Sequence, residues 1–130
     1  MRKNNGLIIT NGVRLERHEL KTVEFLASQG YVIELIQPSR TPNSKTPDFK
    51  MIGLEWETKS PIGKGRSTIE HAFQTAARQS ENILFDLRRT SIEDKDAADI
   101  LSKLMNTSRR VKRLGIITKT EILNWYPFQK

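Results

Sequence analysis

Asp48, Glu57 and Lys59 lie in one short stretch, and their types and spacing suit chemistry on a phosphate ester. Residues 48–59 read as a tight hairpin, in which Glu57 and Lys59 share one face of the second strand and Asp48 can pair across beside Glu57. Two adjacent carboxylates repel each other unless a cation lies between them. A divalent metal there would bind a phosphate oxygen and lower the pKa of a bound water, while Lys59 would orient that water or neutralise the phosphate. The backbone carbonyl of Thr58 is a further candidate ligand.

An ordinary structural role for the same residues is the alternative. Acid and lysine pairs are common on exposed strands, where they form cross-strand ion pairs. We favour the functional interpretation because the surrounding strands are apolar enough to be interior. Glu55 shares a face with Glu57 by simple alternation, so it is either a spare ligand or a residue at the wet end of the strand.

A third carboxylate is expected from the first helix. Glu19, Val23, Leu26 and Gly30 follow helical spacing and lie on one stripe, so Glu19 ends a buried face where a metal would be a suitable partner. Glu16, on the neighbouring edge, is a second candidate for the same role. A solvated helix carboxylate is the alternative for either residue.

Composition narrows the possible cofactors and partners. The chain of 130 residues has no cysteine, and His18 and His71 are too few for a His-rich zinc site, so a metal held by carboxylates would be Mg²⁺ or Mn²⁺ rather than Zn²⁺. The net charge of +7 favours nucleic acid, an anionic surface or an acidic protein as partner. No apolar run is long enough to cross a bilayer, and no membrane partner is expected. The length predicts one domain over residues 1–130, with residues 1–13 frayed.

The pattern of apolar and turn residues predicts an α/β fold with a mixed sheet flanked by helices on both faces. The order is a helix, a three-strand meander, a helix, a strand, a helix and a strand. The predicted segments are helix 16–29, strand 31–37, strands 48–52 and 54–59 joined at Gly53, helix 68–81 capped by Ser67 or Thr68, strand 82–87, helix 91–108 and strand 114–118. A short aromatic tail follows.

A resemblance to known nucleases rests on these motifs. Pro47-Asp48 followed by Glu57-x-Lys59 on the next strand, within this order of elements, resembles the PD-(D/E)XK nuclease superfamily. Together with residues 46–49, residues 56–61 and 79–87 are similar to the C-terminal nuclease domain of CdiA-type contact-dependent growth inhibition toxins. The resemblance covers roughly residues 16–118.

The resemblance implies specific roles. It assigns metal ligation to Asp48 and Glu57 and a catalytic role to Lys59, and it places Gln79, on the second helix, facing the site. Gln74 or Thr75, one turn earlier, is a further candidate to face the site. The ordinary alternative for Gln79 is a helix-terminal hydrogen bond to the backbone. Members of the toxin family are tRNA nucleases that act in a target bacterium's cytoplasm and are blocked by a cognate immunity protein. The same substrate, site of action and partner are therefore expected here.

Basic and aromatic residues are candidates for contact with nucleic acid. The expected phosphate contacts are Lys64, Arg66, Arg88 and Arg89, the first two in a loop that leads into a helix N-terminus. A mobile surface loop is the alternative. Trp125, Tyr126 and Phe128 either stack on bases or, as we favour, seal a core. The run Lys103, Arg109, Arg110, Lys112 and Arg113 is either a solvated helix end or part of a binding surface.

Two other functions stay open from the residues alone. A DNA endonuclease would use the same fold and the same acids, because nothing in the sequence tests for a 2′-hydroxyl. A binding module without catalysis would keep the fold, although it would have little use for Asp48, Glu57 and Lys59 together.

Overall fold

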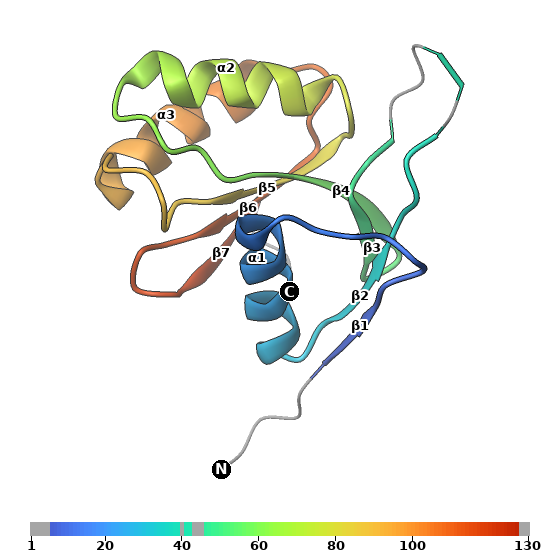
Figure 1. The fold of residues 1–130 in the computed structure, drawn as a ribbon. Helices are drawn as coiled ribbons and strands as arrows, with labels where there is room; N and C mark the ends of the chain where they lie inside the picture. The colour runs from blue at the N-terminus through green and yellow to red at the C-terminus, as the bar shows by residue number, and fades with distance from the viewer. Residues whose placement is uncertain (1–5, 40, 43–45, 128–130) are drawn as a thin grey trace. The chain divides into compact units, whose positions relative to one another are not determined.

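A computed structural model describes residues 6–39, 41–42 and 46–127. Within these residues, seven strands form a mixed sheet in the order β1-β2-β3-β4-β5-β6-β7, and there are three helices (Figure 1). The chain divides into two compact units, residues 1–56 and 57–130, and β4 (Leu54–Lys59) contributes residues to both. The α/β class and the mixed sheet predicted from the sequence are confirmed. The single domain stays a prediction, as does the placement of helices on both faces.

The first unit is built from a parallel pair of strands, a helix and a hairpin. β1 (Leu7–Ile9) runs parallel to β2 (Val32–Leu35), and α1 (Arg17–Ser28) connects them. β3 (Phe49–Met51) pairs antiparallel with β2 and with the first half of β4. The buried side chains of this unit include Val23, Phe25, Leu26, Ile33, Leu35, Phe49, Met51 and Trp56.

The turn of the hairpin falls where the sequence predicts it, at Ile52 and Gly53. Both residues have positive φ, 49° and 76° respectively, which is the pattern of a two-residue type I′ connection. Buried Trp56 braces the hairpin, since its indole Nε1 donates to the carbonyl of Met51 at 3.0 Å. The strand that carries Glu57 and Lys59 is thus aligned by a turn and by a buried aromatic residue.

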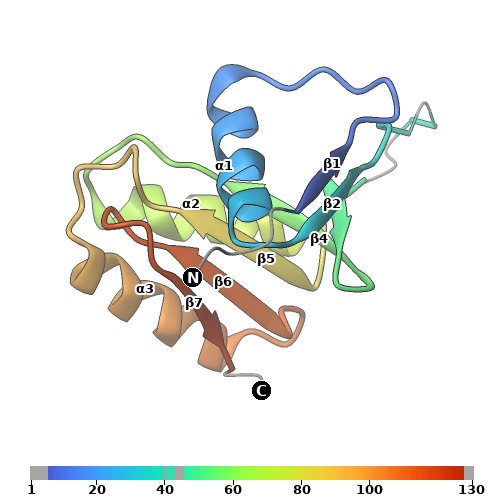
Figure 2. The same cartoon turned by 90° about the horizontal axis from the view of Figure 1, so that it is seen from below.

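The second unit places two helices over a mostly parallel sheet. The last residues of β4 pair with β5 (Asn82–Asp86), which pairs with β6 (Arg113–Ile117), and all three run parallel. β7 (Leu123–Tyr126) closes the unit antiparallel to β6. α2 (Arg66–Ala77) and α3 (Asp94–Thr107) lie side by side over this sheet (Figures 1 and 2). Ile69, Phe73, Leu101 and Leu114 are among the buried residues between them.

Parallel strands give this unit two distinct edges. The carboxyl edge holds the connections that leave β4, β5 and β6, at residues 60–65, 87–93 and 118–122. The amino edge holds the connections that enter β5 and β6, at residues 78–81 and 108–112. The two edges carry different sets of cations.

The structure has two strands that the sequence does not predict, and two of its helices begin at other residues than predicted. Residues 7–9, where the sequence predicts fraying, form β1, because they find a hydrogen-bonding partner in β2 that lies far along the chain. The predicted aromatic tail contains β7. α2 begins at Arg66 after an extended Gly65 rather than at Thr68, and α3 begins at Asp94 rather than at Ser91. Within the described residues no helix has the length and apolar character needed to cross a membrane.

Candidate active site

Glu57 and Lys59 lie on the interior strand β4, as the sequence predicts. Glu57 is only 6% exposed, although it is a carboxylate, and it pairs in the backbone register with Ile83 of β5. Lys59 Nζ lies 3.6 Å from Glu57 Oε2, and Lys59 is half-buried. Thr58 lies between them, opposite Leu84. The strand thus holds the Glu57 carboxylate away from bulk water, with the Lys59 ammonium group beside it as the opposite charge.

The prediction that this strand is interior is confirmed by its pairing on both sides. Its first residues pair with β3, and its last residues pair with β5. Glu55, which the sequence leaves as a spare ligand or a wet strand end, is exposed. The exposure places Glu55 at the wet end.

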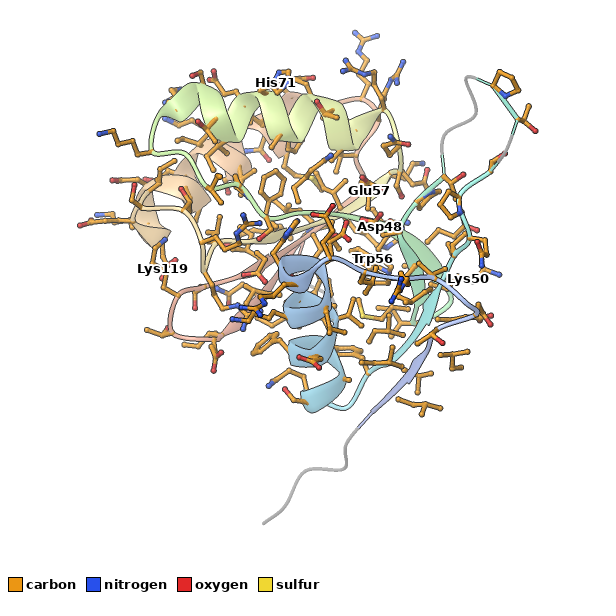
Figure 3. The ribbon with its side chains drawn as sticks, viewed as in Figure 1. Asp48, Lys50, Trp56, Glu57, His71 and Lys119 are labelled. Carbon is orange, nitrogen blue, oxygen red and sulfur yellow. The ribbon has the colours of Figure 1, made fainter. Side chains whose placement is uncertain are left out.

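Asp48, labelled in Figure 3, lies immediately before β3 in the first unit. Its backbone makes hydrogen bonds on both sides. Its N–H donates to the carbonyl of Trp56 at 2.8 Å, and its carbonyl accepts the N–H of Ile36 at 3.0 Å. The side chain is partly buried. Two backbone hydrogen bonds to neighbouring strands fix where this carboxylate starts from, which a ligand position requires.

Glu19, the acid predicted as a third ligand, caps its own helix. Its Oε1 accepts the N–H of Glu16 at 2.9 Å, and the side chain of Glu16 accepts a backbone N–H in return, which forms a capping box. Glu16 also lies 3.7 Å from His18. Both acids therefore have a structural role at the start of α1, and a metal-ligating role for Glu19 stays a prediction.

Gln79 lies beyond α2 rather than on it, which corrects the sequence prediction. The helix ends at Ala77 with Arg78 as its C-cap, and the hydroxyl of Ser80 then accepts the N–H of Asn82 at 3.1 Å, which turns the chain into β5. Gln79 Oε1 is buried and has no hydrogen-bond partner among the described residues, and the same holds for Ser60 Oγ. A buried amide oxygen without a partner is costly, so the position favours an additional donor or cation.

The donor set suits a hard cation, although it is small. Carboxylate, carbonyl and amide oxygens are the ligands that Mg²⁺ and Mn²⁺ prefer. Within the residues that the structure describes, no group of three or more acidic or histidine side chains is arranged to hold a metal. His71, on α2, is exposed (Figure 3). The residues fit Mg²⁺ bound partly by water and phosphate better than a closed Zn²⁺ site.

Two of the four cations predicted to contact phosphate are paired with carboxylates. Arg88 Nη2 lies 2.8 Å from Asp86 Oδ2 and its Nη1 lies 3.0 Å from Glu121 Oε2, while Arg66 Nε lies 2.9 Å from Glu70 Oε2. The hydrogen bond to Asp86 raises the pKa of the Arg88 guanidinium. Asp86 is 2% exposed, so Arg88 chiefly neutralises a buried acid.

The other two cations, Lys64 and Arg89, lie on two connections that hydrogen bonds hold together. Arg89 Nη1 donates to the carbonyl of Ser60 at 3.3 Å, and the hydroxyl of Thr90 donates to the carbonyl of Gly63. Thr90 is buried, and its oxygen also accepts the N–H of Ile92 at 3.3 Å. Loop 60–65 is therefore tied to the β5–α3 connection, whereas Lys64 on it is exposed.

The aromatic residues near the C-terminus pack as the favoured interpretation predicts. Tyr126 packs against the core cluster, and the ring of Trp125 covers Gly115, where a Cβ would lie 2.7 Å from Cζ3. Both residues are partly buried, and packing against the core cluster is confirmed for Tyr126. Phe128 lies outside the described residues.

Sequence reasoning did not find the roles of Asp86 and Thr90. The available signal was an acid at the end of an apolar strand followed two residues later by an arginine, a spacing at which a turn brings the two side chains together. From residue type alone Arg88 is predicted to bind phosphate, because its pairing with Asp86, two residues earlier, depends on the turn between them.

Comparison with known proteins gives the family and the fold. The model of the contact-dependent growth inhibition CdiA C-terminal domain matches residues 45–122, more than half of the chain. The structure is similar to a chain of the CdiA-CT/CdiI toxin and immunity complex from Burkholderia pseudomallei, with a TM-score of 0.69 and 16% sequence identity, over 92% of this chain and 98% of that one. At that identity the likeness shows the fold. No curated protein matches the sequence. The chain belongs to the contact-dependent growth inhibition CdiA C-terminal domain family.

Proposed function

We propose that this domain is a metal-dependent endonuclease that hydrolyses phosphodiester bonds in RNA, with tRNA as its substrate. The observation that carries the proposal is the buried carboxylate of Glu57 with Lys59 Nζ at 3.6 Å, on an interior strand of a toxin-family fold. Burying a carboxylate and a cation costs desolvation free energy, and such groups cluster at functional sites. Phosphoryl chemistry uses both groups.

Asp48 and Glu57 would hold Mg²⁺ or Mn²⁺, with the carbonyl of Thr58 as a further ligand and Glu19 as an optional one. In the hairpin, Phe49 lies opposite Trp56. Asp48 directly precedes Phe49 in the sequence, and Glu57 directly follows Trp56. When bound, the ion would supply charge stabilisation and a water of lowered pKa.

The remaining roles fall to the chain's own side chains. Lys59 would orient the attacking water and neutralise a non-bridging phosphate oxygen, since its ammonium carries three donors. Gln79, with its buried amide oxygen, would orient a water or a ribose hydroxyl. Lys64 and Arg89 would contact phosphates beyond the scissile bond, and Arg66 and Arg88 could do so only in competition with their carboxylate partners.

Glu57→Gln tests the mechanism, and Glu55→Gln is its matched control. Purified protein would be incubated with tRNA and Mg²⁺ or Mn²⁺, and cleavage followed on a denaturing gel. We expect Glu57→Gln to lose at least about a hundredfold in rate and Glu55→Gln to change little, because Glu55 is exposed on the same strand. Cleavage that survives excess chelator or Glu57→Gln in folded protein would show that the mechanism is wrong.

The nature of the substrate needs a separate comparison. Digestion of tRNA and of plasmid DNA under the same conditions would distinguish the RNA endonuclease from a DNA endonuclease of the same fold. If neither is cut, and if calorimetric titration with Mn²⁺ shows no binding, the domain would be a binding module instead.

The partner and the place of action follow from the same proposal. The structural neighbour was solved with an immunity protein, and we propose a cognate immunity protein for this domain as well. Expression in the bacterial cytoplasm should arrest growth, whereas Glu57→Gln should not. Co-expression of a candidate immunity protein should relieve the arrest and block cleavage in vitro.

A further inference from the structure

A hollow between the carboxyl-terminal halves of α2 and α3 has no place in the proposed chemistry. Its volume is about 280 Å³. We call it the basic hollow; it is lined by Phe73, Gln74, Ala77, Leu104, Thr107, Ser108, Arg109 and Arg110. This volume falls just below the range of about 300–1,000 Å³ that is usual for small-molecule sites, so it suits one compact group rather than a protein surface.

The charged residues that line the basic hollow have one sign. The lining contains two arginines and no acid. The sequence has no acidic residue between Asp99 and Glu121, a stretch that also contains Lys103 and Lys112. Within the described residues no carboxylate lies within 4.0 Å of Arg109 or Arg110, and both are exposed. Their full charges exceed the partial negative charge, about half an elementary charge, at the end of α3.

The turn that carries the two arginines is ordered by one side chain. The hydroxyl oxygen of Ser108 accepts the N–H of Arg110 at 3.2 Å and the N–H of Val111 at 3.1 Å. Val111 is buried, and the N–H of Lys112 donates to the carbonyl of Glu81 at 2.7 Å. Two guanidinium groups are thus presented from a braced turn at the amino edge of the sheet.

We infer that the basic hollow binds a phosphodiester of the nucleic-acid substrate, outside the catalytic strand. Guanidinium groups match phosphate oxygens in a fork geometry, and the amide of Gln74 in the same lining can donate as well. An acidic protein is the less suitable occupant, because specific protein interfaces need about 1,000 Å² or more of good fit and this feature is a small recess. The inference rests on the proposed nucleic-acid substrate, but it does not depend on cleavage.

Arg109→Gln/Arg110→Gln is the test, and Arg14→Gln/Lys95→Gln is the charge-matched control at exposed positions elsewhere. Affinity for fluorescein-labelled tRNA would be measured by anisotropy in excess chelator, over roughly 50–200 mM salt. We expect the first variant to lose about tenfold in affinity and to reduce the salt slope of log K by about 1–2. The control should lose about twofold or less.

Two substitutions of Gln74 test the same inference, because they should change the affinity for tRNA in opposite directions. Gln74 is exposed on α2, so substitution should preserve folding. Gln74→Lys should bind tRNA about two- to threefold more tightly, and Gln74→Glu should bind more weakly by a similar factor.

Specific results would overturn the inference. One is an equal loss in the arginine variant and its control, which would mean that only total charge matters. Another is unchanged tRNA binding together with lost binding to labelled poly-glutamate, which would assign the basic hollow to an acidic protein. Binding is measured without metal and therefore tests the basic hollow alone. If the nuclease proposal is wrong, the protein would bind tRNA in this assay but would not cleave it when metal is added.

Discussion

The two edges of the second unit both carry arginines, but in opposite electrostatic settings. At the carboxyl edge Arg88 lies against Asp86 and Glu121, and Arg89 is used to hold the carbonyl of Ser60. At the amino edge Arg109 and Arg110 lie in a stretch without acids. Closeness in sequence to β4 is therefore a poor guide to which arginines are already paired with carboxylates. The acids that the fold brings beside each arginine decide this.

The two edges should differ most in how much an arginine substitution lowers the free energy of unfolding. Arg88→Gln should lower the free energy of unfolding by about 2–3 kcal/mol, because it leaves the buried carboxylate of Asp86 without its cation. Arg110→Gln, the matched change at the amino edge, should stay within about 0.5 kcal/mol. Urea unfolding of the two variants measures both values.

A double variant sharpens this prediction. Asp86→Asn/Arg88→Gln should recover part of the loss, because no buried charge is then left alone. Equal stability of Arg88→Gln and Arg110→Gln would contradict the structural role given to the carboxyl edge.

A smaller effect is expected where the β5–α3 connection is hydrogen-bonded to loop 60–65, which follows β4. Thr90→Val keeps the shape of the side chain but removes the hydroxyl that bonds Gly63 and Ile92, so it should cost about 1–2 kcal/mol. Trypsin should then cut faster after Lys64 in loop 60–65. Ser91→Ala, at an exposed neighbour, is the control, and unchanged cutting in Thr90→Val would show that the hydroxyl does not hold the loop.

The smallest effect concerns Lys64, an exposed cation at the carboxyl edge with a proposed phosphate contact. Lys64→Gln should weaken tRNA binding by about two- to threefold and reduce the salt slope by about 1 or less, because it removes a single flexible charge. Anisotropy in chelator measures both. A loss as large as that of the arginine pair would contradict the ranking of the two edges.

Local sequence patterns predicted the elements around the site better than the contacts within it. The hairpin and Glu57-x-Lys59 follow from alternation and from Gly53, which are properties of neighbouring residues. β1 and the pairing of Glu19 could not be predicted in this way. β1 depends on a partner strand more than twenty residues away along the chain. The helical spacing of Glu19 predicts a metal ligand, whereas its side-chain oxygen accepts the N–H of Glu16 at the start of the same helix.

The same distinction explains the errors at the cations and at Gln79. Whether Arg88 is available depends on a turn that brings Asp86 and Glu121 to it, and residue type alone does not reveal that turn. The end of α2 was predicted too late because residues 78–81 contain no glycine or proline to mark it. Helix ends marked only by serine and asparagine are weak signals.

The hairpin turn has a consequence for how inactive variants can be studied. Ile52 adopts a left-handed conformation that a β-branched residue tolerates poorly, and its side chain is 59% exposed. Asparagine accepts this conformation more readily, so Ile52→Asn offers a reserve of stability at a position that takes no part in the proposed chemistry. A stabilised background of this kind would keep costly substitutions such as Glu57→Gln folded, so that a lost activity can be assigned to the missing carboxylate.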